Sequence, residues 1–302
     1  MTALKRDVRY VPVSQLWLRH RIGQNEVAAV LVGYMDESYD GTESSKVFTL
    51  SCLVSDTSMW IHFEWAWLRV LEEKNKELRS QGRKELSRFH SKEINNFAGE
   101  YKDWDGAERQ AFCEKLTDVF RQHPVHIHSF DIPLDVLIEE IPETKPNPVG
   151  FAYCLLLTDI MKQIGEKTLP LYPRDVIQLH HDHSKYDATL CEWFNQLLDD
   201  EKFQWRKQFV SITSQRWDVC VLLQPADLVA YENFKEGMRK VEGSKESKRG
   251  RMRAGLDALI NLESISGRAV GYTRDGIQQI KQNLDSNPEL KQGVLKAARI
   301  LR

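Results

Sequence analysis

Three aspartates of the 302-residue chain stand where an apolar segment ends or faces inward. Asp36 follows the apolar run VAAVLVGYM, and Asp182 ends the segment VIQLHHD. Asp227 falls within the apolar stripe of LLQPADLVAYENF, a segment whose apolar residues recur at helical spacing. We therefore expect all three carboxylates to point into the protein, with Asp36 and Asp182 at the carboxyl ends of strands, the edge where open α/β sheets bind ligands.

Several carboxylates buried near one another are unfavourable, because desolvation penalises the charged form and like charges raise one another's pKa. A divalent cation removes this conflict. Carboxylate oxygens, with the other coordination positions left to water and phosphate, are typical of Mg²⁺ or Mn²⁺ rather than of structural zinc. Paired ions of this kind activate water and stabilise the leaving oxygen of a phosphodiester. Asp36, Asp182 and Asp227 are thus the candidate metal ligands and catalytic carboxylates.

Each aspartate also has a structural interpretation. Asp36 fits the start of a polar turn in DESYDG. Asp227, close after Pro225, fits a residue that satisfies free N–H groups in the first turns of a helix. These interpretations explain one acid at a time, whereas three apolar segments each carry one.

The segment FHSKE, at 89–93, offers further candidates. His90 is a candidate proton shuttle or orienting group, and Glu93 is a candidate fourth ligand. Ser91 and Lys92 are candidate phosphate contacts. The start of a surface helix is the structural alternative for this segment.

Histidines surround Asp182 in the sequence HHDH, and a zinc hydrolase is therefore a further hypothesis. Adjacent residues of a strand point to opposite faces. Only His180, or a neighbour such as His183 at a bent chain end, can then join Asp182 at one metal, which makes zinc the weaker hypothesis.

The formal net charge of −2 excludes a globally basic nucleic-acid binder, so any phosphate binding must come from local basic patches. One basic patch covers 79–92 and another covers 235–253. The second includes the apolar-poor stretch EGSKESKRGRMR, which reads equally well as a solvated linker or as a phosphate-contacting loop. Its candidate nucleic-acid-binding residues are Lys245, Lys248, Arg249, Arg251 and Arg253.

Alternating strand and helix patterns position these residues. An opening strand that ends near Asp36 forms a hairpin with a strand over 47–55. The later predicted elements are helices over 58–82, 105–122, 149–166, 187–200 and 222–236, and strands over 125–133, 175–182 and 209–215. PETKPNP is predicted to be a loop. This order predicts an α/β fold with a mixed sheet covered by helices on both faces. Residues 254–302 are predicted to be mainly helical, with a break near Ser266 and Gly267.

The bulk composition fits an ordinary globular protein. The chain is 41% hydrophobic and 10% aromatic, and its apolar runs are too short to cross a bilayer. Five cysteines without a CxxC pair read as reduced core residues. Because the opening MTALKRDVRY lacks the apolar segment of a secretory signal, we expect a cytoplasmic protein.

Four motifs together resemble the bacterial and phage family known as domain of unknown function 3800. They are YMDES (34–38), FHSKE (89–93), the strand-ending Asp182, and QPADLVAY (224–231), and the resemblance covers about 27–236. It implies a ribonuclease-H-like domain over 1–238, and the basic loop and helical C-terminal extension that we expect over 239–302 lie outside the resemblance. It also implies metal binding by Asp36, Asp182 and Asp227, with His90 and Glu93 as an accessory pair. Further accessory candidates in and around these motifs are Glu37, Ser38, Lys92, His180, His183 and Gln224.

The leading hypothesis is a nuclease, or a related phosphodiester-processing enzyme, that depends on Mg²⁺ or Mn²⁺ and acts on DNA or RNA. The alternative is a catalytically silent module that binds nucleic acid or a protein in a phage-defence or mobile-element system, since this fold hosts both active and inactive members. The sequence leaves the substrate, the mode of cleavage and the oligomeric state open.

Overall fold

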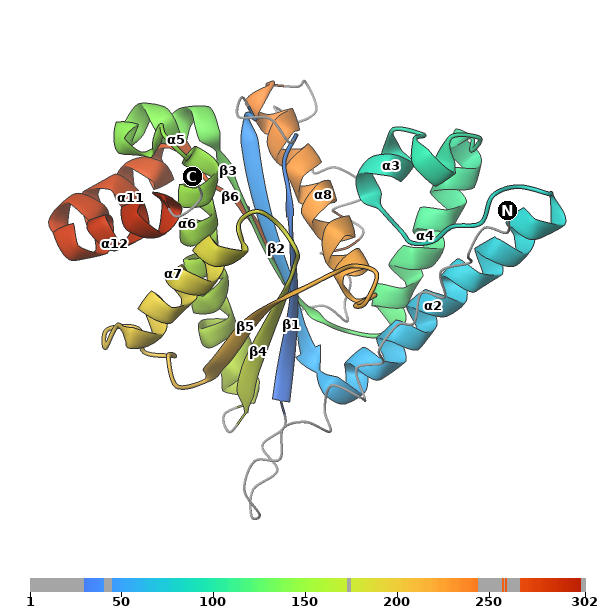
Figure 1. Cartoon of the computed structure of the whole chain (residues 1–302), viewed down its shortest axis with the longest axis horizontal. Helices are drawn as coiled ribbons and strands as arrows, with labels where there is room; N and C mark the ends of the chain where they lie inside the picture. The colour runs from blue at the N-terminus through green and yellow to red at the C-terminus, as the bar shows by residue number, and fades with distance from the viewer. Residues whose placement is uncertain are drawn as a thin grey trace, which may run out of the picture.

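The structure, a computed structural model, describes residues 30–40, 45–172, 175–243, 257, 259 and 267–299. Figure 1 shows a twisted central sheet with helices on both of its faces. Helices α2, α4 and α8 lie on one side of the sheet, and helices α5, α6, α7, α11 and α12 lie on the other.

The sheet has six strands in the order β5-β4-β1-β2-β3-β6. β1 pairs with β4 in parallel and with β2 in antiparallel fashion; β2 and β3 are antiparallel, and β4–β5 and β3–β6 are parallel pairs. The strands span Val30–Ser38 (β1), Val47–Asp56 (β2), His126–Pro133 (β3), Val176–Asp182 (β4), Phe209–Gln215 (β5) and Gly267–Gly271 (β6). The predicted α/β class, with a mixed sheet flanked by helices and helices at the C-terminal end, is confirmed.

The helices match the predicted segments closely. They span Thr57–Ser80 (α2), Ser91–Asn95 (α3), Gly106–Gln122 (α4), Leu134–Glu140 (α5), Pro148–Gln163 (α6), Asp187–Asp199 (α7), Leu223–Val241 (α8), Arg274–Ser286 (α11) and Pro288–Arg299 (α12). Short helical turns span Gly99–Tyr101 (η1), Pro142–Thr144 (η2), Ile164–Thr168 (η3) and Leu169–Leu171 (η4). The turn η2 lies inside the predicted PETKPNP loop, and α3 lies in a segment predicted to be irregular.

Strand β1 is buried on both faces, as its unbroken apolar run predicted. Leu31 and Met35 enter the core beneath α6 and α7, whereas Val32 and Tyr34 enter the core beneath α2 and α8. Between them, a Cβ on Gly33 would lie 2.7 Å from Cδ2 of Leu179 on β4, so a larger residue at this point of the sheet would force Leu179 to move. By alternation, Asp36 continues the face of Val32 and Tyr34. The strand therefore delivers this carboxylate to the side of the sheet that α8 covers.

The C-terminal residues 267–299 contribute a strand to the sheet as well as helices. The prediction missed β6, which pairs with β3 and extends the sheet. α12 packs on α6 and α7, and its Val294 and Leu295 belong to the core on that face. Residues 267–299 thus share the sheet and the core of the preceding elements. No helix in the described residues is long and apolar enough to cross a membrane.

Candidate functional site

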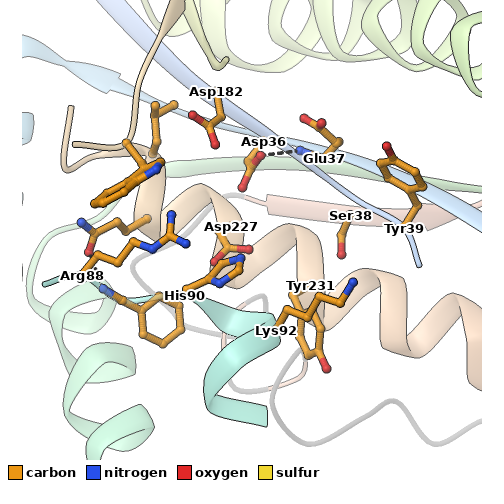
Figure 2. A pocket seen from close by; sticks show the side chains of 14 residues that line it. Asp36, Glu37, Ser38, Tyr39, Arg88, His90, Lys92, Asp182, Asp227 and Tyr231 are labelled. Atoms are coloured by element: carbon orange, nitrogen blue, oxygen red, sulfur yellow. Dashed lines mark hydrogen bonds between the residues drawn. The ribbon is translucent and has the colours of Figure 1, made fainter. Parts of the chain in front are cut away.

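A pocket of about 210 Å³ lies at the carboxyl ends of β1 and β4, beside the first turns of α8. Asp36, Asp182 and Asp227 all line it, and Figure 2 shows the three side chains facing one space. The parallel pairing of β1 with β4, in which Met35 lies opposite His181, brings Asp36 and Asp182 to the same edge of the sheet. Strands and helix from three distant parts of the chain therefore converge on one acidic pocket.

Asp36 carries the most unfavourable charge in this pocket. Burial raises the pKa of its carboxyl well above the usual range, and the charges of Glu37, Asp227 and Asp182 raise it further. The one hydrogen bond that opposes this rise comes from the backbone N–H of Glu37, which donates to Oδ1 of Asp36 at 2.9 Å. Asp36 is thus held in place by a weak local contact while nearby negative charges repel it.

Asp182 and Asp227 show the same conflict with stronger compensation. Burial raises the pKa of both carboxyls, and Asp227 raises that of Asp182 further. The N–H of His183 donates to Asp182 at 2.9 Å, and the N–H of Ser91 donates to Asp227 at 2.7 Å. Arg88 favours the charged form of both acids. Asp227 therefore accepts a backbone N–H at the start of α3, and not at the start of its own helix as the structural interpretation predicted.

The donor set fits a hard divalent cation by its chemistry, because the pocket gathers buried carboxylate oxygens whose mutual repulsion a cation would relieve. The positions of the pocket's side chains support a metal site less strongly than their chemistry does. Within the described ranges, no three His, Cys, Asp or Glu side chains already form a metal-binding group. Metal binding by Asp36, Asp182 and Asp227 thus requires the side chains to rotate toward a common centre.

Glu37 lies next to Asp36 but points to the other face of the sheet. Burial raises the pKa of its carboxyl to about 7, against the lowering effect of the nearby Tyr153 hydroxyl of α6. Glu37 also lines the pocket, as does Ser38. The sequence YMDES consequently sends two neighbouring carboxylates to opposite sides of the end of β1.

His90 and Glu93 differ in their position relative to the pocket. His90 lines the pocket and, through Nδ1, lies 3.1 Å from Oε1 of Glu93. Glu93 does not line the pocket, and it also lies 3.5 Å from Arg88. The structure therefore places Glu93 beside His90 and Arg88, outside the pocket, and not among the three aspartates.

The histidines around Asp182 also face elsewhere. His180 is buried, stacks on Tyr34 with ring centroids 5.4 Å apart, and bonds Thr213 at 2.7 Å. His183 is 64% exposed and lies 2.5 Å from Asp187. Neither lines the pocket. Both side chains are engaged away from Asp182, which removes the basis for a zinc site built on HHDH.

Gln224 positions the pocket wall. Its Oε1 accepts hydrogen bonds from the indole of Trp67 at 3.1 Å and from the N–H of Phe89 at 3.0 Å. It thereby ties the start of α8 to α2 and to the segment that carries His90 and Ser91. The buried Gln224 thus lines the pocket from a position that these two hydrogen bonds hold.

Sequence reasoning missed the pairing of Arg88 with Trp217. The Arg88 guanidinium lies 4.1 Å from the centroid of the Trp217 ring, and both residues line the pocket. The only signal for Arg88 was its place in the basic patch over 79–92. There, Arg79, Arg83 and Lys84 pair with acids outside the pocket, and only Arg88 and Lys92 of the patch line it.

The predicted nucleic-acid-binding residues Lys245, Lys248, Arg249, Arg251 and Arg253 lie outside the described residues. No family model, no curated protein and no solved structure matches this chain. The fold and pocket define an α/β protein with an acidic pocket at the carboxyl edge of a mixed sheet.

Proposed function

We propose that the protein is a phosphodiester-cleaving enzyme, a nuclease, that depends on Mg²⁺ or Mn²⁺. One observation carries the proposal: three carboxylates from β1, β4 and α8 share a pocket in which burial and mutual repulsion penalise their charged forms. A divalent cation would relieve this penalty and would supply Lewis-acid chemistry at a phosphate. Asp36, Asp182 and Asp227 would hold it, and the site would work in the cytoplasm, where the five free cysteines stay reduced.

The chain's own cations complete the proposed site. Arg88, His90 and Lys92 line the same pocket from the segment before and within α3. A phosphodiester brought to the aspartates would meet Arg88 and Lys92 as countercharges. His90, oriented by Glu93, would hold or move a proton at its Nε2. The substrate class that this arrangement favours is a nucleic-acid strand.

Cleavage assays test this proposal. Purified protein is incubated with labelled single- and double-stranded DNA and RNA in Mg²⁺, Mn²⁺ or EDTA. We expect metal-dependent cleavage, and we expect Asp36→Asn and Asp182→Asn to lower it by at least about a hundredfold, since each ligand supports several kcal/mol of transition-state stabilisation. Asp199→Asn, an exposed change at the end of α7, is the matched control. Absence of cleavage under every condition, or full activity of both variants, would rule the proposal out.

The second candidate is a catalytically silent module that binds nucleic acid or a protein partner. It is favoured by the absence of a preformed three-residue metal group in the described ranges and by the structural bond from Ser91 to Asp227. It predicts that Asp36→Asn and Asp182→Asn leave binding intact and that Mn²⁺ leaves the melting temperature unchanged. Metal-dependent thermal stabilisation separates the two candidates.

A further inference from the structure

A second groove continues from the acidic pocket along α8. It has a volume of about 390 Å³ and shares Ser38, Tyr39, Lys92 and Tyr231 with the pocket. Figure 2 shows Lys92 and Tyr231 at one end of the acidic pocket, opposite Asp182. The two hollows are thus parts of one continuous surface depression.

One face of α8 forms the floor of both hollows. Asp227 and Tyr231 are four residues apart, and Lys235 follows after another four, so the three side chains lie on the same side of the helix. Asp227 lines the pocket, Tyr231 lines both hollows, and Lys235 lines the groove. Eight residues correspond to about 12 Å along the helix axis.

The excess of carboxylates in the pocket ends along this path. The pocket is dominated by carboxylates, whereas the groove carries the ammonium groups of Lys92 and Lys235. Within the described ranges neither lysine pairs with a carboxylate, and Lys235 instead lies over the rings of Tyr231 and Phe234, at 5.2 and 5.7 Å from their centroids. Both ammonium groups are consequently available to an external anion.

The remaining charged side chains of the groove balance the two lysines in formal charge, so the lysines act as local contacts and not through a net positive field. Asp40 and Glu242 also line the groove, and Arg239 is held by Glu236 at 2.7 Å. Lys92 and Lys235 therefore supply the phosphate-directed charge. Tyr39 lines both hollows and is half-buried against Phe48, with ring centroids 5.9 Å apart, and the part of its ring that stays accessible is our candidate surface for stacking an unpaired base.

We infer that this groove binds a single-stranded segment of nucleic acid next to the phosphate that enters the acidic pocket, with backbone phosphates on Lys92 and Lys235 and a base against Tyr39. The inference rests on the proposed function, because it names the form of the substrate that the same site takes. A duplex would bury its base faces and make no use of Tyr39.

Binding and its salt dependence test this inference separately from cleavage. The full chain is titrated, in EDTA so that no metal-dependent cleavage intervenes, with fluorescent twelve-nucleotide single strands of DNA and of RNA and with a DNA duplex of the same sequence. We expect tighter binding of the single strands than of the duplex. Lys235→Ala should weaken single-strand binding and flatten the slope of log Kobs against log salt concentration by about 0.7, as the loss of one phosphate contact predicts.

Matched variants make the outcome decisive. Lys235→Arg keeps the charge and should keep the slope, which distinguishes a phosphate contact from a folding defect. Lys207→Ala, an exposed change just before β5 at the opposite edge of the sheet, should leave affinity and slope unchanged. An unchanged slope in Lys235→Ala, tighter binding of the duplex, or no binding by the unaltered protein would each overturn the inference. Cleavage by the unaltered protein in Mn²⁺, measured in parallel, shows whether the proposed function stands when the groove assignment fails.

Discussion

The backbone N–H of Ser91 donates to Oδ2 of Asp227 at 2.7 Å and thereby joins two segments 136 residues apart in the chain. Ser91 begins α3 and is fully buried, while Asp227 belongs to α8. A single carboxylate therefore fastens the segment that carries His90 to the helix that carries the third aspartate. The contact gives Asp227 a structural role in addition to its proposed metal-binding role.

Replacing Asp227 with alanine and with asparagine separates these two roles. Asp227→Ala leaves the buried N–H of Ser91 without an acceptor, and we expect a loss of about 1–3 kcal/mol in the free energy of unfolding. Asp227→Asn retains an oxygen acceptor and removes the repelling charge, so the metal-free protein should keep its stability while metal-dependent cleavage is lost. Urea denaturation and cleavage assays measure the two effects. Equal destabilisation by both substitutions would contradict the assigned hydrogen bond.

The carboxylate cluster predicts a pH-dependent stability that metal reverses. The folded-state pKa of Asp36 lies above its unfolded value, so its protonated form stabilises the fold below the unfolded pKa and this stability is lost as pH rises through the folded pKa. In EDTA, the melting temperature should therefore fall as pH rises through the folded pKa of Asp36. Stabilisation by Mn²⁺ should grow over the same range, because the metal binds the deprotonated ligands.

A thermal melting series from pH 5 to pH 8, with and without Mn²⁺, checks this prediction. Asp36→Asn removes one titrating group and should reduce the pH dependence in EDTA without abolishing it, because burial also raises the pKa of Glu37 and of Asp131 to about 7. If the melting temperature of the metal-free protein instead rises with pH, and Asp36→Asn shows the same slope of melting temperature against pH, groups other than Asp36 control the profile.

Asp131, which does not line the acidic pocket, predicts a second pH effect. It lies on β3, is 3% exposed, and its Oδ2 has no hydrogen-bond partner among the described residues. Burial raises the pKa of its carboxyl to about 7. Because the folded pKa exceeds the unfolded one, stability is lost as pH rises through about 7. Asp131→Asn should raise the free energy of unfolding at pH 8 by up to about 4 kcal/mol.

The gain from Asp131→Asn should vanish below about pH 3, where the wild-type carboxyl is protonated in both the folded and the unfolded state. Denaturant unfolding at the two pH values measures the difference. Asp135→Asn, an exposed change on α5, is the control. An equal gain at both pH values would show that packing, and not ionisation, is responsible.

Arg88 is expected to act through its charge and through its stacked geometry. Trp217 holds the guanidinium plane, a contact that contributes roughly 0.5–1 kcal/mol at an exposed site. Arg88→Ala should raise KM for an oligonucleotide by removing a phosphate contact, and Arg88→Lys should restore the charge but only part of the affinity. Trp217→Leu should give a smaller rise in KM with Arg88 intact. Steady-state kinetics measure all three, and an unchanged KM in Arg88→Ala would remove Arg88 from substrate binding.

Local sequence patterns predicted most of the fold because most elements have strong periodicity. The end of β1, the limits of β5 and the start of α8 follow directly from apolar spacing and from Pro225. β6 was missed because GRAVG is short and contains two glycines, and because its pairing partner β3 lies more than a hundred residues earlier. A strand that forms mainly because it pairs with a strand far away in the sequence has little signal in its own residues.

The acidic pocket was predictable to a similar degree. Asp36, Asp182 and Asp227 stood out because each interrupts apolar residues, and all three line the pocket. The expected grouping of Glu93 with these aspartates does not occur, because i,i+3 proximity pairs it with His90. The partnership of Arg88 and Trp217 joins two loops and has no periodic signature, so only the three-dimensional structure reveals it.

The pairing of β6 with β3 also bears on how the chain is made. During synthesis, β3 emerges well before residues 267–271, and 134 residues separate its last residue, Pro133, from Gly267. At ordinary elongation rates this interval lasts roughly 7–27 s. Throughout it, β3 presents an open hydrogen-bonding edge of the kind that recruits foreign strands. The nascent protein therefore passes through a stage of exposure to misassembly, and a shortened version that stops at α8 would retain that exposure permanently.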